Sequence, residues 1–264
     1  MSKSICISAI LALASTGALA QNASSKATAA INTAVYCTLT TTANTSGLAA
    51  PTTCTDIYSG ATVATYSDDF IPIMSTSIKV SNSQSLFVTP SLVTGLYTNT
   101  TTKTKSGGSS TAVASGGVYM RAVLRNPNTG DVVAIAYPLV NCTDVTLGCV
   151  TGTSGGSGSY WGVILDSRVQ TLTQALSNCV ADVGGVTGTC SFDLTTQLIL
   201  QTTSAHTFGF IFPNVGVGTY NVSIEAAVDS NATLSGTGVA VGSAAFGLGS
   251  VTVESVRLVH SFSF

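Results

Sequence analysis

Threonine is the residue type that most constrains the fold of this chain. It outnumbers the charged residues taken together, and serine, glycine and valine follow closely. β-Branched residues fit the pleated surface of a strand, and small residues fit tight turns. Charged residues make up only 8% of the chain, whereas helical bundles and coiled coils depend on Glu, Lys and Arg. The composition therefore predicts a β protein, and 264 residues suffice for one sandwich or barrel domain.

The charge balance argues against nucleic acid as a partner. Nine Lys and Arg residues face eleven Asp and Glu residues, so the net charge is −2. Binding to a phosphate backbone needs a surplus of basic side chains that displaces counterions. Disorder over most of the chain is also disfavoured, because it combines high charge with a hydrophobic content lower than the 45% found here.

The N-terminal segment Met1–Ala20 has the pattern of a secretory signal peptide. Lys3 supplies a positive start, and Ile5–Leu13 supplies an apolar core that is too short to span a bilayer. Ala18-Leu19-Ala20 has the small-x-small pattern of a cleavage site, which leaves Gln21 as the new N-terminus. No later stretch is long and apolar enough to predict a transmembrane segment, so we expect the mature chain to be secreted and extracellular.

Six cysteines follow the signal peptide, and an even number in an oxidising compartment predicts three disulfide bonds. They are Cys37, Cys54, Cys142, Cys149, Cys179 and Cys190. The sequence leaves the pairing open. We favour pairing each cysteine with its neighbour in the chain, because each such pair brackets a loop rich in Gly, Thr, Ser or Asn. No Cys-x-x-Cys motif occurs, which argues against a zinc or redox site.

Six Asn-x-Ser/Thr sequons predict surface positions if the source glycosylates its secreted proteins. They begin at Asn22, Asn44, Asn99, Asn141, Asn221 and Asn231. Asn221 falls inside an expected strand, so its side chain is predicted to point outward.

A polar, flexible lead-in is predicted over residues 21–31, followed by a single β-sandwich domain over residues 32–264. Within the domain, Val118–Arg125 and Val132–Val140 predict a β-hairpin, because the residues between them tolerate tight or left-handed geometry. The strand expected over Ser91–Lys105 ends in Thr, Asn and Lys only. That end is expected to protrude into solvent.

Three further segments carry specific expectations. Asp193–Thr203 is predicted to form one short helix, with Asp193 as its N-cap. Thr219–Val228 alternates apolar and polar residues, which places Glu225 on the outer face of a strand. In the last strand the apolar phase shifts, which predicts a β-bulge near Glu254-Ser255.

Many short strands, antiparallel turn signals and little helix predict an antiparallel two-sheet β-sandwich of the jelly-roll or Ig-like kind. The segment Gly216–Ile224 resembles the turn and strand of such sandwiches, where a Tyr two residues after a Gly packs at a sheet corner. The runs Ser85–Tyr97, Thr203–Phe208 and Phe246–Glu254 resemble uncharacterised secreted all-β proteins, and the similarity extends from about Lys79 onward. This resemblance implies a fold class and no activity.

Residues that commonly carry catalysis are few. A Ser/His/Asp relay would have to use one of the two histidines, and no Gly-x-Ser-x-Gly motif stands in a strand–turn–helix context. His206 is expected at the entry to a strand with its ring bonded to backbone, and His260 on the surface near the C-terminus. Acidic residues such as Glu225 and Glu254 are expected to be solvated. We therefore predict no catalytic residue, metal or cofactor, and lean against an enzyme.

The aromatic pair Tyr160-Trp161 is the one candidate ligand-binding feature. It follows a Gly/Ser-rich loop, and exposed aromatic rings stack on the C–H groups of pyranose sugars. The alternative is that Trp161 packs in the core at the start of a strand. The leading hypothesis is an extracellular binding or structural module associated with glycans or a cell-wall polymer. The alternatives are a secreted polysaccharide hydrolase and a self-associating component of a surface coat.

Overall fold

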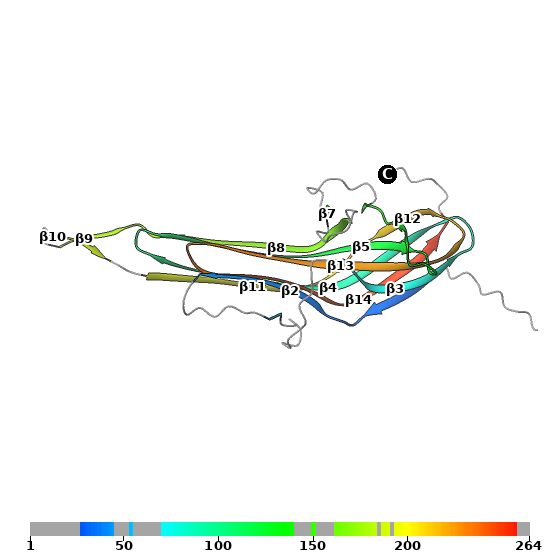
Figure 1. Ribbon diagram of the computed structural model, residues 1–264, viewed down its shortest axis with the longest axis horizontal. Helices are drawn as coiled ribbons and strands as arrows, with labels where there is room; N and C mark the ends of the chain where they lie inside the picture. Colours follow the sequence, from blue (N-terminus) through cyan, green and yellow to red (C-terminus); the bar gives the residue numbers. More distant parts are fainter. Residues whose placement is uncertain are drawn as a thin grey trace, which may run out of the picture.

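The computed structural model describes residues 27–44, 53–54, 70–139, 149–151, 161–183, 186–190 and 193–257. These residues are almost entirely strand, and two antiparallel sheets pack against each other as a β-sandwich, as the sequence predicts (Figure 1). The predicted signal peptide lies outside the described residues. No helix in the described part of the chain is long and apolar enough to cross a membrane.

The strands have the following bounds: β1 Ala27–Asn32, β2 Tyr36–Asn44, β3 Ile71–Val80, β4 Gln84–Lys105, β5 Ser109–Arg125, β6 Val132–Ile135, β7 Cys149–Thr151, β8 Trp161–Ala175, β9 Cys179–Val183, β10 Val186–Cys190, β11 Asp193–Thr207, β12 Phe210–Val215, β13 Gly218–Ser235 and β14 Thr237–Val256.

Each layer of the sandwich contains strands that are far apart in sequence. Sheet I has the order β1-β14-β4-β11, with β2 beside β14 and β12 beside β4. Sheet II has the order β3-β13-β5-β8-β7, with β6 beside β5. Strands β9 and β10 form a separate hairpin. The β5–β6 hairpin expected from the sequence is confirmed, with Val123 opposite Ile135.

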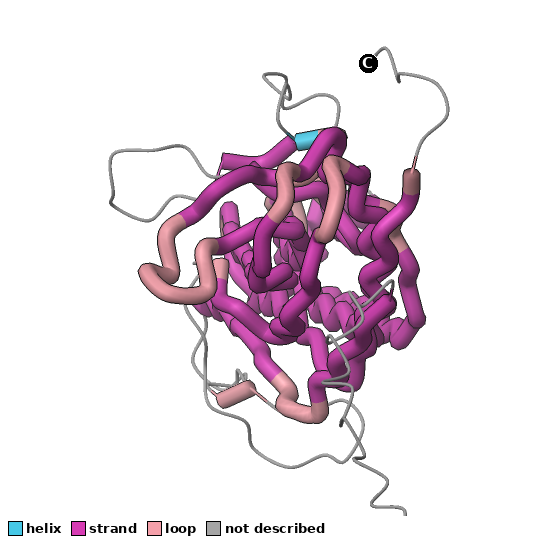
Figure 2. Tube along the Cα trace, turned by 90° about the vertical axis from the view of Figure 1, so that its right-hand side faces the viewer, coloured by secondary structure: helices cyan, strands magenta, loops and turns pink. Residues whose placement is uncertain are grey.

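Long strands make the molecule a rod with one broad end. β4 has 22 residues, so at about 3.3 Å per residue it runs for about 70 Å. We call the narrow part the shaft, which comprises residues 39–44, 98–116, 166–175, 193–204 and 230–243. The broad end, which holds β1, β3, β6 and β12, we call the head (Figure 1). Seen from the head, the strands of both sheets are arranged around a common interior (Figure 2).

The head holds the main apolar core. Its fully buried side chains come from both sheets and include Phe210 and Phe246 of sheet I and Met120, Leu124 and Ile224 of sheet II. Alternation at the start of β12 places Phe210 and Phe212 inward, as the sequence predicts, before the register shifts between Phe212 and Val215. The core therefore forms where large apolar residues of both sheets face each other.

The shaft has a different interior, built from small and polar side chains. Thr98, Thr100 and Thr102 of β4 are fully buried, although the sequence led us to expect this end of the strand in solvent. That expectation was wrong because β4 is flanked by β14 and β11 and its inner face is covered by sheet II. A Cβ added to Gly242 of β14 would lie 2.2 Å from the carbonyl oxygen of Ser115 in β5. The two sheets therefore approach backbone to backbone.

Side-chain hydrogen bonds join the two sheets along both edges of the shaft. On one edge, Thr40 Oγ1 of β2 donates to the Ser230 carbonyl of β13 at 2.9 Å, and Thr42 Oγ1 donates to the Ala232 carbonyl at 2.8 Å. On the other edge, Gln170 of β8 bonds to threonines of β4. These bonds satisfy polar groups that an apolar core would leave unpaired.

The segment 193–203 is strand rather than helix. β11 pairs with β4 over its whole length, from Asp193 opposite Lys105 to Thr207 opposite Ser91. The apolar spacing that suggested a helix is short, and the threonines favour a strand once a neighbouring strand offers a full ladder of hydrogen bonds. The prediction of a short helix was therefore wrong.

The β-bulge in the last strand lies elsewhere than predicted. The register of β14 against β4 shifts between Gly247 and Gly249, and Leu248 has a φ of 37°. Glu254 and Ser255 stay in register with β4. Flanking glycines lower the cost of an irregular backbone, so they locate the bulge better than the apolar phase does.

Candidate functional site

The aromatic pair proposed from the sequence is largely outside the described structure. Tyr160 is not among the described residues, and Trp161 opens β8 with only its backbone described. The role of this pair as a sugar platform therefore stays a prediction.

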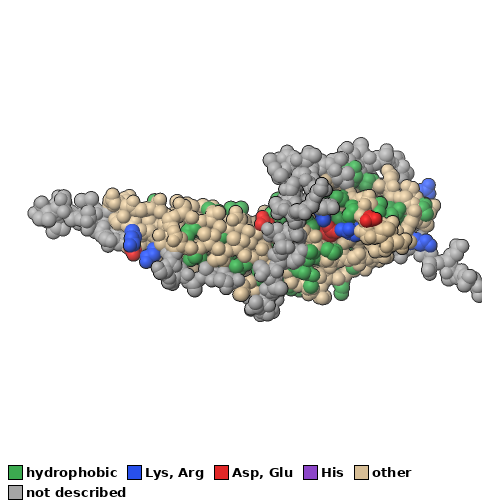
Figure 3. Space-filling view, in the orientation of Figure 1, with side chains coloured by type: hydrophobic (Ala, Val, Ile, Leu, Met, Phe, Trp, Pro, Cys, Tyr) green, Lys and Arg blue, Asp and Glu red, His purple; other side chains and the backbone are tan. Residues whose placement is uncertain are grey.

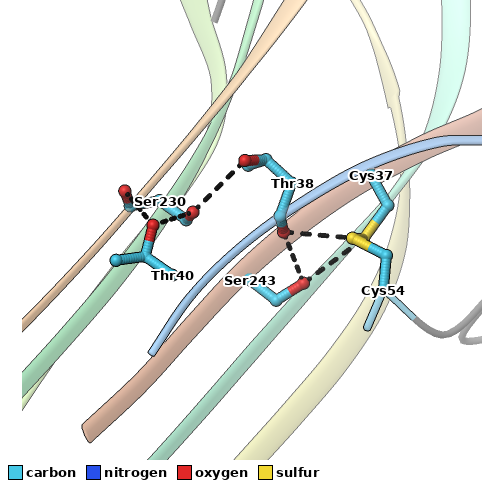
Figure 4. Close-up of a disulfide and its surroundings, with 6 residues drawn as sticks. All are labelled: Cys37, Thr38, Thr40, Cys54, Ser230 and Ser243. Atoms are coloured by element: carbon cyan, nitrogen blue, oxygen red, sulfur yellow. Dashed lines mark hydrogen bonds between the residues drawn. A yellow bond between two sulfur atoms is a disulfide. The ribbon is translucent and has the colours of Figure 1, made fainter. Parts of the chain in front are cut away.

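One of the three expected disulfide bonds is present. Cys37 of β2 is bonded to Cys54, and a hydrogen bond links the Cys37 sulfur to Ser243 Oγ of β14 at 3.4 Å (Figure 4). Strands β9 and β10 place Cys179 opposite Cys190, but their pairing stays a prediction. Cys149 opens β7, and Cys142 lies outside the described residues.

The sequons differ in their exposure. Asn44 and Asn231 are exposed, whereas Asn99 and Asn221 are half-buried. The side chain of Asn221 accepts a hydrogen bond from Ser77 Oγ on the solvent side of β13 and β3. Asn22 and Asn141 lie outside the described residues.

His206 lies in a polar cluster between β11 and β8. Its Nε2 is 2.8 Å from Ser204 Oγ and 3.4 Å from Asp166 Oδ2. Thr94 Oγ1 of β4 donates to the same Asp166 oxygen at 2.6 Å. The expectation that backbone groups would hold this ring was wrong, because β8 brings a carboxylate across the edge of the sandwich.

This cluster does not have the geometry of a nucleophile relay. In such a relay the serine and the carboxylate bond to opposite nitrogens of the imidazole. Here both contact the same nitrogen, Nε2, so no path leads from Ser204 through the ring to Asp166. The cluster instead links sheet I to sheet II at the head end of the shaft. His260 lies outside the described residues.

Glu225 of β13 is buried, which corrects the expectation that it faces solvent. Arg121 of β5 donates through Nε to Glu225 Oε2 at 2.7 Å, and Arg125 binds the other carboxylate oxygen. The ring of Phe70 covers the Arg121 guanidinium at 4.4 Å. The alternation in this strand identified the face that packs against sheet I, but it did not show that the opposite face is covered too. Burial of one carboxylate is tolerated because two guanidinium groups balance it.

The head contains a cleft that is lined by described residues. It consists of two adjoining hollows of about 300 Å³ and about 600 Å³, which share Val133 and Tyr220. The turn between β5 and β6, the strand β6 and the turn between β12 and β13 form its walls. Its other lining residues are Leu124, Asn126, Pro127, Asn128, Ala134, Ile135, Tyr137, Phe212, Pro213, Asn214, Val215, Gly216, Gly218 and Thr219. We call it the head cleft.

Local structure fixes the aromatic rings of the head cleft. A Cβ on Gly218 would lie 3.1 Å from the Tyr220 ring, so this ring lies against the turn that precedes it. The Tyr220 ring also packs against the main apolar core. The Tyr137 backbone is held by hydrogen bonds to Ile211 at 2.9 Å and 3.2 Å. No local sequence pattern marks Tyr137, because its position depends on the bridge to Ile211 in β12.

Amide side chains occupy the rim of the same cleft. Asn126 Oδ1 accepts the backbone N–H of Asn128 at 2.9 Å, which orders the β5–β6 turn. Asn214 stands on the opposite wall with a φ of 51°, a conformation that asparagine adopts more readily than most residues. The described lining thus combines aromatic rings, amides and apolar side chains, and it contains no charged side chain.

Comparisons with known proteins assign the chain to no family. The chain matches no protein-family model, and no curated protein matches it at a significant level.

Proposed function

We propose that the protein is an extracellular binding module whose head cleft takes a neutral saccharide. The observation that carries this proposal is the position of Tyr220, whose side chain lines both hollows of the cleft. Ligand sites combine aromatic and apolar walls with a few placed polar groups. A pyranose presents C–H groups that pack on an aromatic ring and hydroxyls that bond to amides, which both donate and accept.

The neutral lining favours an uncharged sugar over a phosphate or an acidic polymer. Asn126, Asn128 and Asn214 are the polar side chains at the rim, together with the hydroxyl of Thr219. A charged ligand would leave its solvation shell for a cleft that offers no opposite charge. A cell-wall or storage polysaccharide built of neutral hexoses fits this chemistry.

The predicted signal peptide and the disulfide bond support an extracellular location. The structure contains the Cys37–Cys54 disulfide bond. Disulfide bonds persist in oxidising compartments and are rare in the reducing cytosol. The shaft, which is rigidified by bonds between its two sheets, would hold the head cleft at a distance from whatever surface retains the protein.

Binding to an array of neutral oligosaccharides tests the proposal. The variant Tyr220→Leu keeps an apolar side chain on the core but removes the aromatic ring, so we expect binding to fall at least tenfold. Tyr220→Phe is the matched control, because it keeps the ring, and we expect it to bind within about threefold of the wild type. Denaturation curves of both variants verify that each is folded.

Two results would contradict the proposal. One is the absence of binding to any neutral oligosaccharide by the folded wild type. The other is loss of binding in Trp161→Leu with full binding in Tyr220→Leu, which would move the site to the aromatic pair at the start of β8.

A further inference from the structure

Strand β11 contains a palindromic sequence. Residues Thr195–Thr203 read Thr-Thr-Gln-Leu-Ile-Leu-Gln-Thr-Thr, and the order is the same in both directions around Ile199. In an antiparallel pair of two such strands centred on Ile199, every residue of this segment lies opposite an identical residue. A pairing of this kind has the two-fold symmetry of a dimer of identical chains.

β11 is also an exposed edge. It is the last strand of sheet I, and among the described residues it pairs only with β4. Ile199, Leu198 and Leu200 are 51%, 40% and 42% exposed. Edge strands are usually protected by lysine, proline or a bulge, and Thr195–Thr203 contains no such residue and pairs with β4 without a register shift. The visible face of the shaft carries few charged side chains (Figure 3).

The register shows which backbone groups of β11 are available. The N–H of Phe208 donates to the Pro90 carbonyl of β4 at 3.1 Å, one residue beyond the last paired position, Thr207 opposite Ser91. Hydrogen-bonded pairs alternate along an antiparallel ladder, so the even-numbered residues of β11 bond to β4. The N–H and C=O groups of the odd-numbered residues therefore point away from β4. In the palindrome these residues are Thr195, Gln197, Ile199, Gln201 and Thr203.

We propose that β11 is a homodimer interface, in which two copies of the chain join edge to edge around a two-fold axis at Ile199. Thr195 then lies opposite Thr203 of the second copy, Gln197 opposite Gln201, and Leu198 opposite Leu200. The five odd-numbered residues of each copy form about ten main-chain hydrogen bonds, which is the number found in a typical protein interface. The two copies of sheet I become one continuous sheet.

The side chains favour a second copy over another extended partner. Thr–Thr pairs and β-branched pairs such as Ile199 with itself stabilise a strand pair, and like charges directly opposite destabilise it. The palindrome has no charged residue, so self-pairing brings no like charges together. The nearest acid along the chain, Asp193, lies beyond the palindrome and already pairs with Lys103 of β4 at 3.7 Å.

Sedimentation of the secreted protein after removal of N-glycans tests this interface. We expect the wild type to have twice the mass of one chain. In Ile199→Lys and in Ile199→Glu, each alone, the two-fold axis places like charges against each other, and we expect the mass of one chain. An equimolar mixture of the two variants places opposite charges together, and we expect the doubled mass to return.

Ile31→Lys is the matched control, because Ile31 is an equally apolar residue, 75% exposed, on the opposite edge strand of sheet I. We expect it to keep the doubled mass. A wild type with the mass of one chain at all concentrations overturns the proposal. So does a doubled mass in either single Ile199 variant, a mixture that stays at the mass of one chain, or loss of the dimer in Ile31→Lys. The saccharide array tests binding in the head cleft independently of the sedimentation experiment. The proposed saccharide site and the proposed dimer can therefore each fail without the other.

Discussion

Gln170 of β8 offers the sharpest test of the polar interior of the shaft. Its side chain is buried, Oε1 accepts a hydrogen bond from Thr98, and Nε2 donates to Thr100 Oγ1 at 2.6 Å and to the Leu198 carbonyl at 2.7 Å. The substitution Gln170→Met keeps the length of the side chain and removes both polar atoms. It therefore removes the bonds of Gln170 to the buried hydroxyls of Thr98 and Thr100 and to the part-buried carbonyl of Leu198.

The expected loss follows from these three bonds. A buried hydrogen bond contributes about 1 kcal/mol, and a buried group left unpaired costs about 1–3 kcal/mol. We expect Gln170→Met to lower the free energy of unfolding by about 3 kcal/mol, which corresponds to a fall in Tm of about 6–12 °C for a domain of this size.

Urea denaturation followed by circular dichroism measures this loss. Thr171→Ala, at an exposed position next in the same strand, is the control and should change the free energy of unfolding by about 0.5 kcal/mol or less. Replacing Thr98 and Thr100 by valine removes the two hydroxyl groups that Gln170→Met leaves without their hydrogen bond. In that background the cost of Gln170→Met should fall below about 2 kcal/mol. A loss under about 1 kcal/mol in the wild-type background, or an equal loss in both backgrounds, would refute the reasoning.

Two further predictions concern the buried ion cluster and the disulfide bond. Glu225→Gln removes the buried carboxylate charge that binds Arg121 and Arg125, so the free energy of unfolding should fall by about 3–5 kcal/mol, whereas the exposed control Glu254→Gln should change it by less than about 0.5 kcal/mol. Chemical denaturation measures the free energy of unfolding of both variants. Equal values for Glu225→Gln and Glu254→Gln would contradict a stabilising role of the ion cluster. Replacing both Cys37 and Cys54 by alanine opens a loop with a sequence separation of 17 residues, which should lower the free energy of unfolding by about 3 kcal/mol. Calorimetry checks this, and an unchanged Tm would show that the bond does not constrain the unfolded chain.

The fold class could be predicted from local patterns. The phenylalanines of β12 alternate with a period of two, and the turn between β5 and β6 has residues that suit a hairpin, so both features are visible without a structure. Each of these features depends on a few neighbouring residues.

The errors arose where distant strands decide the environment. The burial of Thr98 depends on β8 lying over β4, and the burial of Glu225 depends on two arginines of β5 and on Phe70. The apolar spacing around Leu198 fits a helix and a strand equally well until β4 supplies a partner. Neither the head cleft nor the edge at Ile199 can be located before the order of the strands is known.

Chemical-shift mapping tests whether the head cleft binds a neutral saccharide. A ¹H–¹⁵N spectrum of the labelled protein is recorded during titration with an oligosaccharide that binds on the array. We expect the largest shift changes at Asn128, Val133 and Tyr220, while the shaft amides of β11 stay unchanged. Shift changes confined to the start of β8 or to the shaft, with none around Tyr220, would contradict it.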